Sequence, residues 1–421
     1  MIARTAGTRP RKHKPTPAFA LLALLVAVLT GCNTPSPVGP PPPPPDYARA
    51  LPPGASALRL VTDPAERPDL TQLAAQFADP GFIESLSRSV AWYDFPSSQR
   101  TFPISGISHV HARTSAQALQ WILANTGNPQ QAAEQIDREF DVYTSVGWDG
   151  NGGVLITGYY SPVFSASYER TGQYQYPLYK RPSDLLADPT TGQTFGRRNP
   201  DGTVTQYPTR AQIEQQNLLA GGELVFLPSR LDAYSIEVNG SAKLDMTDGT
   251  TLYVGYDGNN GYEYTSIGRQ LVADGKLDAN TVSMPAIRRF FLENPAELER
   301  YIQRNDRFIF FKPYEATDWP AGSLGFRVEG NRSLATDKEV YPPGAVVLVR
   351  TERTNNGGPI NQLMLDQDTG GAIRAPGRAD LYFGIGPVAE QQAGVLAVEG
   401  RLYYLFLKRE LVQGWYNRLG Q

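Results

Sequence analysis

From Gly153 to the end of the chain, the apolar residues come in short runs that are bounded by glycine and proline. Runs of this kind favour the strands of a compact β-barrel over a parallel sheet covered by helices. The expected strands lie at residues 154–157, 224–227, 234–238, 251–255, 308–311, 346–350, 363–365 and 401–407. Asp248-Gly249 and Asn260-Gly261 are typical of hairpin turns. We therefore predict an α+β chain, mostly β, with two β-barrel domains.

Helical patterns dominate two other regions. Between residues 46 and 147, a helix is expected at residues 115–124, where apolar residues recur at the spacing of one helix face. In the middle of the chain, Ser283 is expected to cap a helix. Asn294-Pro295 should end that helix and start another, which reaches about Arg304.

The first 31 residues combine a basic stretch with an apolar run at residues 18–29. A helix that crosses a bilayer needs about 20 apolar residues, so this run is predicted to be a signal peptide instead. The four residues Leu29-Thr30-Gly31-Cys32 resemble the lipobox of bacterial lipoproteins, whose cysteine becomes the lipidated first residue. The alternative interpretation is a stray thiol beyond an ordinary cleavage site. Cys32 is the only cysteine, so no disulfide forms within one chain.

The residues after Cys32 suggest where the mature protein resides. In lipoprotein sorting patterns, an aspartate directly after the lipidated cysteine favours the inner membrane. This chain has Asn33 at that position, so its resemblance to those patterns favours the outer membrane. Residues 32–46 contain an unbroken proline run at 40–45 and are predicted to form an extended linker. We expect an outer-membrane lipoprotein of a Gram-negative bacterium that faces the periplasm and contacts the lipid bilayer through Cys32.

The charge balance limits the kinds of partner. Loss of residues 1–31 removes five basic residues and no acidic ones, which leaves 34 basic against 42 acidic residues. A surface with this balance argues against nucleic acid as a partner, because neutralising phosphates requires basic groups. A sugar polymer would be held by hydrogen bonds and ring stacking. The remaining 390 residues suggest two domains.

Three aspartates in the last hundred residues are candidates for acid–base chemistry. Asp380 precedes Leu381, Tyr382 and Phe383, and burial among them would raise its pKa from about 3.9, as a general acid requires. Asp368 precedes Gly370 and Gly371, which leave room for a tight turn or for close approach of a ligand. Asp337 is the third. The alternative is that these aspartates are ordinary turn or capping residues.

Several segments, in order from about Gly153 to Tyr404, resemble the membrane-bound lytic murein transglycosylase A family. They are residues 157–162 (TGYYSP), 176–179 (YPLY), 259–268 (NNGYEYTSIG), 283–288 (SMPAIR), 308–311 (FIFF), 367–373 (QDTGGAI) and 380–382 (DLY). This family consists of lipoproteins, in agreement with the leader. The chain departs from the usual family pattern at residues 239–242 (NGSA) and 305–307 (NDR), so the glycan contacts of the inserted domain are expected to differ.

The resemblance implies a double-psi β-barrel domain with a second, inserted β-barrel domain and a substrate groove between the two. In this sequence the parts would be a signal peptide at 1–31, a proline-rich linker at 32–46, a catalytic domain with N-terminal helices at 47–157 and 309–421, and a substrate domain at 158–308. The final segment resembles the "three aspartate" domain of the family.

The resemblance also implies the chemistry. It indicates a peptidoglycan lytic exotransglycosylase, a carbon–oxygen lyase that cleaves the β-1,4 bond between N-acetylmuramic acid and N-acetylglucosamine and forms 1,6-anhydromuramic acid. Asp380 matches the catalytic residue, and Asp368 and Asp337 become supporting residues. Its partners would be glycan strands and, in addition, other cell-wall enzymes, with no cofactor and no metal. The expected substrate contacts are Thr157, Gly158, Tyr159, Tyr160, Ser283, Gly370 and Gly371.

Other interpretations remain open at this stage. His109 and His111 could place two imidazoles on one face of a strand, but no third metal ligand has a matching spacing, and a polar loop is the plainer interpretation. Tyr159, Tyr160, Tyr262 and Tyr264 could stack on sugar rings or simply fill the core. The rival functions are a lysozyme-like hydrolase, which would need a second carboxylate, and a non-catalytic lipoprotein that binds the cell wall.

Overall fold

The structure is a computed structural model that describes residues 45–189, 192–278, 282, 284–352 and 358–420. The predicted signal peptide, Cys32 and residues 32–44 of the predicted linker lie outside the described residues, as does Ser283. In the described ranges, helix takes up 31% and strand 28%, so the expectation of a mostly β chain is wrong. None of the described helices is long and apolar enough to cross a membrane.

The N-terminal part is helical, as predicted. It comprises β1 (Leu58–Leu60), η1 (Leu70–Leu73), α1 (Ala74–Phe77), α2 (Pro80–Tyr93), α3 (Pro96–Gln99), α4 (His109–Asn125) and α5 (Pro129–Glu139). The start of α2 follows from its sequence, because Asp79 accepts a hydrogen bond from the Phe82 N–H and Pro80 needs no N–H partner in the first turn. The helix expected at 115–124 is confirmed within α4.

The two histidines of the chain's described part lie in the first turn of α4. His109 and His111 therefore belong neither to a strand nor to a polar loop, and both of those interpretations are wrong. Ser108 caps this helix by accepting a hydrogen bond from the His111 N–H. The His111 ring is buried and its Nε2 lies 2.7 Å from the carbonyl oxygen of Leu407, so the side chain joins α4 to a strand of the sheet described next.

An eight-stranded sheet forms the centre of this part of the molecule. Its later strands are β2 (Phe140–Ser145), β3 (Val154–Ser161), β13 (Ser333–Ala335), β14 (Val346–Thr351), β15 (Asn361–Asp368), β16 (Arg378–Ile385) and β17 (Ala397–Leu407). The strand order is β1-β2-β17-β14-β15-β13-β16-β3, and β3 also pairs with β17. This additional pairing closes a ring of six strands, from β17 through β14, β15, β13, β16 and β3 back to β17.

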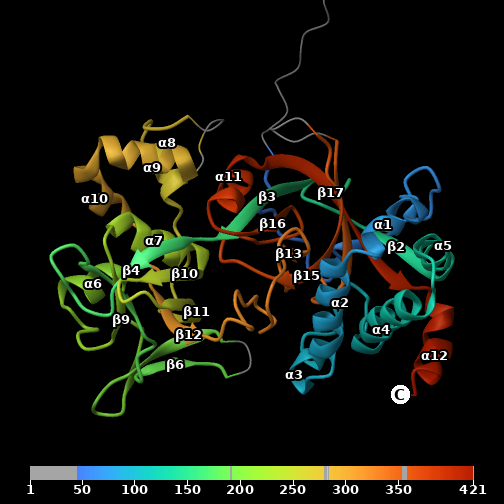
Figure 1. The fold of residues 1–421 in the computed structure, drawn as a ribbon, viewed down its shortest axis with the longest axis horizontal. Coiled ribbons are helices and arrows are strands. Elements are labelled where there is room, and N and C mark those ends of the chain that lie inside the picture. The colour runs from blue at the N-terminus through green and yellow to red at the C-terminus, as the bar shows by residue number, and fades with distance from the viewer. Residues whose placement is uncertain (1–44, 190–191, 279–281, 283, 353–357, 421) are drawn as a thin grey trace, which may run out of the picture. The chain divides into compact units, whose positions relative to one another are not determined.

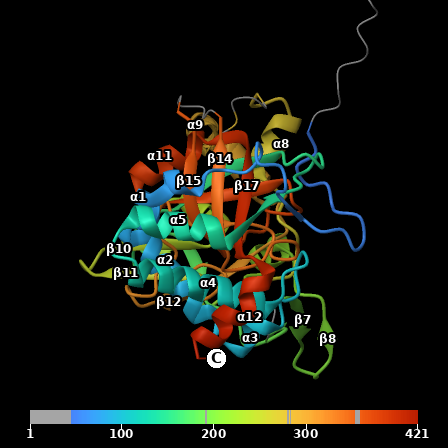
Figure 2. The same ribbon diagram turned by 90° about the vertical axis from the view of Figure 1, so that its right-hand side faces the viewer.

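The ring is built from buried apolar residues of strands that are far apart in sequence. Val347, Leu363, Leu365 and Tyr404 are all fully buried in one large core cluster. The same cluster includes residues of α2, α4 and α5, and Figure 1 shows these helices and α12 (Arg409–Arg418) beside the strands. Figure 2 looks onto this helical group, in which α4 contacts both α2 and α12. The helices therefore stabilise one side of the ring.

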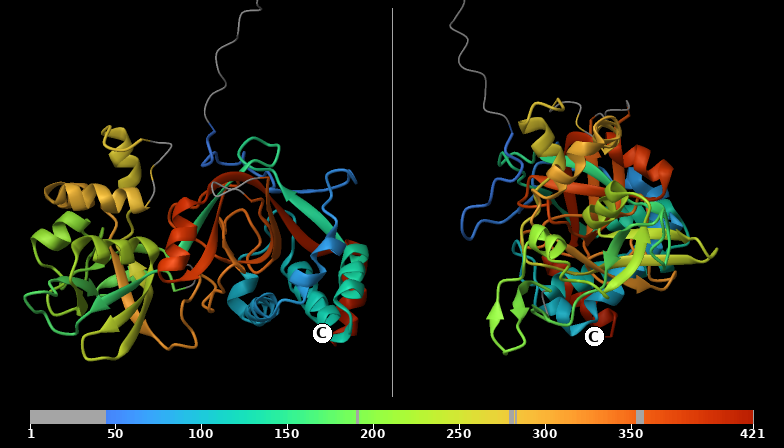
Figure 3. Two further views of the ribbon diagram at one scale, coloured as in Figure 1. Left: turned by 45° about the horizontal axis from the view of Figure 1, so that its top comes forward. Right: turned by 90° about the vertical axis from the view of Figure 1, so that its left-hand side faces the viewer.

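The residues between β3 and β13 form three small sheets and several helices. The strands are β4 (Val163–Ala166), β5 (Tyr176–Tyr179), β6 (Leu185–Ala187), β7 (Thr194–Arg198), β8 (Val204–Thr205), β9 (Glu223–Leu227), β10 (Ser241–Met246), β11 (Thr251–Asn259) and β12 (Ile309–Tyr314). The helices are α6 (Arg210–Gln215), α7 (Arg230–Asn239), α8 (Ile267–Ala273), α9 (Met284–Glu293), η2 (Pro295–Glu297) and α10 (Leu298–Ile302). Figure 3 shows these inserted elements, green to yellow, beside the ring.

The inserted strands are also joined in a circle. One sheet has the order β12-β11-β10-β4 and another pairs β5 with β9. Single bridges connect the two sheets at both ends, between Ser167 and Phe226 and between Lys180 and Phe311. The third sheet, β6-β7-β8, stands apart from this circle.

Two local predictions in the insertion are wrong. Residues 234–238 belong to helix α7 and not to a strand, because Ser229 caps this helix and Gly240 ends it in the left-handed conformation. Asn260-Gly261 does not form a hairpin: β11 ends there, and the side chain of Asn259 accepts a hydrogen bond from the Gly261 N–H. The Asp248-Gly249 hairpin, which joins β10 to β11, is confirmed.

Candidate functional site

Asp380 lies on β16, at the point where this strand runs parallel to β3 and directly opposite Thr157. The Thr157 hydroxyl donates a hydrogen bond to Asp380 Oδ1. The Asp380 side chain is 14% exposed, so it is sheltered yet reachable from solvent. Leu381, which was expected to bury it, points to the opposite face and joins the core, since successive side chains of a strand alternate.

Arg378 is a member of the site that the sequence analysis missed. It precedes Asp380 by two residues on the same strand, so both side chains leave the same face of β16. Its Nε lies 3.2 Å from Asp380 Oδ1 and its Nη2 lies 3.4 Å from Thr157 Oγ1. The spacing of two residues between Arg378 and Asp380 is a signal that could have found it, but no strand was predicted at residues 378–385.

Asp368 ends β15 and is held by three donors. Its Oδ2 accepts a hydrogen bond of 2.7 Å from the Tyr159 hydroxyl, and its Oδ1 accepts from the backbone N–H groups of Ser323 and Thr369. Burial raises the pKa of the Asp368 carboxyl, and these hydrogen bonds act in the opposite direction. Burial and the neighbouring Asp368 raise the pKa of Tyr159 well above its usual value, so its hydroxyl remains a donor.

Asp337 supports the chain segment that leads into β16. It is 5% exposed, and its Oδ2 accepts a 2.6 Å hydrogen bond from the N–H of Ala375, a residue with positive φ. The next residue, Pro376, offers its carbonyl oxygen to the Tyr341 hydroxyl at 2.7 Å. Asp337 thus has a structural role: from a separate segment, it holds the loop that leads to Arg378 and Asp380.

A fourth acidic residue, Asp366, was not identified from the sequence. It is completely buried and accepts hydrogen bonds from the Thr336 hydroxyl, the Lys338 ammonium group and the Tyr404 hydroxyl. Burial raises the pKa of Asp366, while Lys338 and the hydroxyl donors lower it. Its partners come from segments that are distant in sequence, so no local pattern could have indicated this cluster.

The predicted glycan contacts fall into separate groups. Thr157 and Tyr159 touch the aspartates, as described above. Gly158 faces α11 (Pro387–Val395), and a Cβ atom there would lie 2.8 Å from the Cα of Ala393. Tyr160 is 5% exposed and packs in the same cluster as α11.

Of the remaining predicted contacts, Gly370 and Gly371 lie in the loop after β15, and Ser283 lies outside the described residues. Gly371 is exposed, and a Cβ atom there would lie 3.7 Å from the Cβ of Tyr264, a residue of the insertion. Gly370 is partly exposed. Burial raises the pKa of Tyr264, and Arg378 is among the charges that act on it. The loop of Gly371 is therefore where the insertion approaches the aspartates.

The segments that depart from the family pattern have structural partners in this chain. Asn239 ends α7 and Ser241 begins β10, with Gly240 between them. The buried Asn305 accepts a hydrogen bond from the Thr265 N–H and donates one to the Tyr234 hydroxyl. These residues shape the turn between α7 and β10 and the entry to β12.

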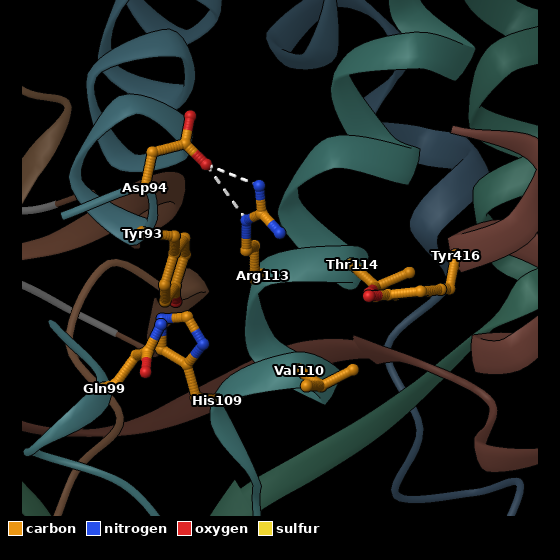
Figure 4. Close-up of a pocket in the computed structure, with 8 residues that line it drawn as sticks. All are labelled: Tyr93, Asp94, Gln99, His109, Val110, Arg113, Thr114 and Tyr416. Atoms are coloured by element: carbon orange, nitrogen blue, oxygen red, sulfur yellow. Dashed lines mark hydrogen bonds and ion pairs between the residues drawn. The ribbon is translucent and has the colours of Figure 1, made fainter. Parts of the chain in front are cut away.

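A cavity of about 380 Å³ lies among α2, α3, α4 and α12. None of the residues that line it belongs to the candidate site. Figure 4 shows its lining, in which Arg113 is paired with Asp94 and Tyr93 lies beside His109. Among the described residues, no group of three histidine, cysteine or acidic side chains could hold a metal ion.

Two family descriptions match the sequence, the MltA specific insert domain over residues 155–312 and the 3D domain over residues 332–406. Membrane-bound lytic murein transglycosylase A of Escherichia coli strain K12 is 33% identical over 272 residues, which are 63% of this chain and 69% of that protein. The protein of the same name from Vibrio cholerae is 31% identical over 304 residues, which are 70% of this chain and 75% of that protein.

Solved structures give the same result. The crystal structure of Escherichia coli MltA with bound chitohexaose matches with a TM-score of 0.63 at 28% identity, and the match covers 86% of this chain and 96% of that one. A membrane-bound lytic murein transglycosylase from Agrobacterium tumefaciens matches with a TM-score of 0.71 over 85% of this chain and 99% of that one. At 23% identity, the second likeness shows the fold alone.

Proposed function

The chain belongs to the family of membrane-bound lytic murein transglycosylase A, and we propose that Asp380 is the acid and base of its reaction. The bond cleaved is the β-1,4 bond between N-acetylmuramic acid and N-acetylglucosamine, and the product carries 1,6-anhydromuramic acid. The observation that supports this assignment is the geometry of Asp380, which is a sheltered, partly exposed carboxylate with Thr157 and Arg378 at one of its oxygens.

In the proposed mechanism one carboxyl group is sufficient. Asp380 donates its proton to the glycosidic oxygen as that bond breaks. The C6 hydroxyl of the same muramic acid then attacks the anomeric carbon, and Asp380 takes up the hydroxyl proton. Because nucleophile and electrophile belong to one sugar, the attack has a high effective concentration, which offsets the lack of a second carboxylate.

Asp368 and Asp337 are proposed to support Asp380 in different ways. Asp368 fixes the Tyr159 hydroxyl and the start of the loop that contains Gly371. Asp337 holds Ala375 and thereby the path of the chain into β16. Thr157, Tyr159 and Gly371 remain the best placed of the predicted glycan contacts, since they lie at or beside the aspartates.

We further propose that the six-stranded ring is the double-psi barrel and that the strands from β4 to β12 form the inserted barrel, with the glycan bound between them. The predicted limits of the insertion, 158 and 308, are adjusted in this proposal, because β3 extends to Ser161 in the ring and β12 (Ile309–Tyr314) pairs with β11. The strand pairings and the two connecting bridges in the insertion support this division. The relative from Escherichia coli has been solved with a bound glycan, chitohexaose. Anchoring of this chain to the outer membrane through Cys32 is proposed from the sequence alone.

Mass analysis of digested murein sacculi tests the class of reaction. The proposal expects muropeptides that are lighter than hydrolysis products by one water, because the anhydro ring replaces the added hydroxyl group. Products with free reducing ends would instead indicate a lysozyme-like hydrolase. If the purified protein bound sacculi but released no soluble fragments, it would be a wall-binding lipoprotein.

A further inference from the structure

The guanidinium of Arg378 touches three different segments of the site. Besides Asp380 on its own strand and Thr157 on β3, it reaches the carbonyl oxygen of Ala372 with Nη1 at 3.4 Å. Ala372 belongs to the loop that starts at Asp368. One side chain thus connects both strands of the parallel pair with the loop that faces the insertion.

The contacts of Arg378 are longer than those of a tight ion pair. A bidentate guanidinium–carboxylate pair has distances of about 2.7–2.9 Å to two oxygens, whereas Arg378 approaches only Oδ1 of Asp380, at 3.2 Å. The side chain is 23% exposed. Its geometry therefore holds the carboxylate without locking it, which suits a group that has to lose and regain a proton.

We propose that Arg378 is a positioning residue for Asp380, which holds the carboxylate against Thr157 in the orientation that proton transfer to the glycosidic oxygen requires. This inference rests on the proposed function of Asp380. Because the same guanidinium also holds the carbonyl oxygen of Ala372, Arg378 fixes the carboxylate relative to the loop that faces the insertion.

Other titratable groups lie near the Arg378–Asp380 pair, but they have hydrogen-bond partners of their own. Tyr159 shares its proton with Asp368 and not with Asp380. Two tyrosines interact with the pair: the charge of Asp380 acts on Tyr159, and the charge of Arg378 acts on Tyr264. Of the hydrogen bonds described above, only those of Thr157 and Arg378 reach the carboxylate of Asp380.

The test is the steady-state kinetics of the full chain in detergent, with soluble glycan strands as substrate and anhydro-muropeptide release as the readout. Arg378→Gln is expected to lower kcat by at least about tenfold, with a smaller change in KM, because the carboxylate loses the side chain that orients it while the glycan contacts stay in place. Arg378→Lys, which keeps a charged donor beside Asp380, should restore part of the lost kcat.

Arg374→Gln is the matched control. Arg374 lies four residues before Arg378, and its Nη1 donates to the backbone carbonyl oxygens of Gly370 and Ile373. Its loss removes the same charge from the loop just before β16, so an effect equal to that of Arg378→Gln would overturn the proposal. Melting temperatures of all variants show whether Arg378→Gln folds. If it does not, Arg378→Lys decides: the proposal expects a lowered kcat at a nearly unchanged KM, and wild-type values of both would overturn it.

The outcome for Asp380 separates this inference from the proposed function. If Asp380→Asn still formed anhydro products, the proposed function would fail whatever Arg378 did. If Asp380→Asn were inactive while Arg378→Gln kept the wild-type kcat, only the inference on Arg378 would be wrong.

Discussion

At the scale of single residues, the site depends on side chains that meet across strand pairings. Thr157 and Asp380 are opposite each other only because β3 and β16 are parallel and in register. The sequence indicated Asp380 and Asp368 through the resemblance of their motifs. It could not indicate Asp366, whose partners Lys338 and Tyr404 are 28 and 38 residues away.

Tyr159→Phe tests the contact between Tyr159 and Asp368. Removing the hydroxyl leaves the Asp368 Oδ2 without its donor, which should cost about 1–3 kcal/mol in the free energy of unfolding and reduce kcat. Urea unfolding and turnover of glycan strands measure the two effects. Tyr382→Phe is the control, because its hydroxyl bonds the buried Ser161 and no aspartate; it should lose stability while kcat stays near the wild-type value.

At the scale of elements, close packing of β3 against α11 depends on Gly158. A methyl group at this position would lie 2.6 Å from the Phe383 ring and 2.8 Å from the Ala393 backbone. Gly158→Ala should therefore destabilise the protein by about 1–3 kcal/mol in urea unfolding. Gly414→Ala on α12 has nothing within 4 Å and should be neutral or slightly stabilising; equal effects of the two changes would contradict this account.

The attachment of α4 to β17 should make stability depend on pH. Burial lowers the pKa of His111, whose Nε2 contacts the Leu407 carbonyl, below the value of about 6.5 expected in the unfolded chain. The unfolded chain therefore binds the proton more readily, and stability falls as pH drops below about 6.5, by at most about 1.4 kcal/mol per pH unit for one histidine. His109 contributes in the same direction, because burial also lowers its pKa.

Urea unfolding between pH 5 and pH 8 measures this dependence. His111→Gln keeps a donor for the Leu407 carbonyl but has no titration, so its curve should be flatter than that of the wild type. A wild-type slope that the substitution leaves unchanged would show that other groups are responsible.

Four of the six ring strands, β3, β14, β15 and β17, were predicted because each contains a short, separate apolar run. The other two, β13 and β16, were not predicted. The run at 234–238 alternates like a strand but belongs to a helix, which Ser229 and Gly240 cap.

At the scale of the whole molecule, the resemblance of the sequence to the family predicted an insertion between two parts of one catalytic domain. The circular order of the strands could not be predicted, because it depends on contacts between segments that are distant in sequence. Only contacts such as the bridge between Lys180 and Phe311 join the inserted sheets. Pairings at sequence separations this large leave no local pattern. The strand content was overestimated because that prediction was based on the short apolar runs after Gly153. The long helices α2, α4 and α5 all precede that region.

The proposed anchor can be tested separately from catalysis. Cys32→Ser removes the only thiol that could be lipidated, so the protein should move from the membrane fraction to the soluble fraction after cell disruption. Its kcat on soluble glycan strands should equal that of the wild type, because the aspartates lie in the described part of the chain beyond residue 44. Continued membrane attachment of the variant would contradict the lipid anchor.

The central claim is that one carboxyl group, that of Asp380, moves the proton in both directions. The most direct measurement compares anhydro-muropeptide release by wild-type protein and Asp380→Asn, together with glycan binding by both. We predict a loss of about 10²–10⁴-fold or more in release for the variant, with binding retained. Release at the wild-type rate by a variant that cannot donate this proton would contradict the account.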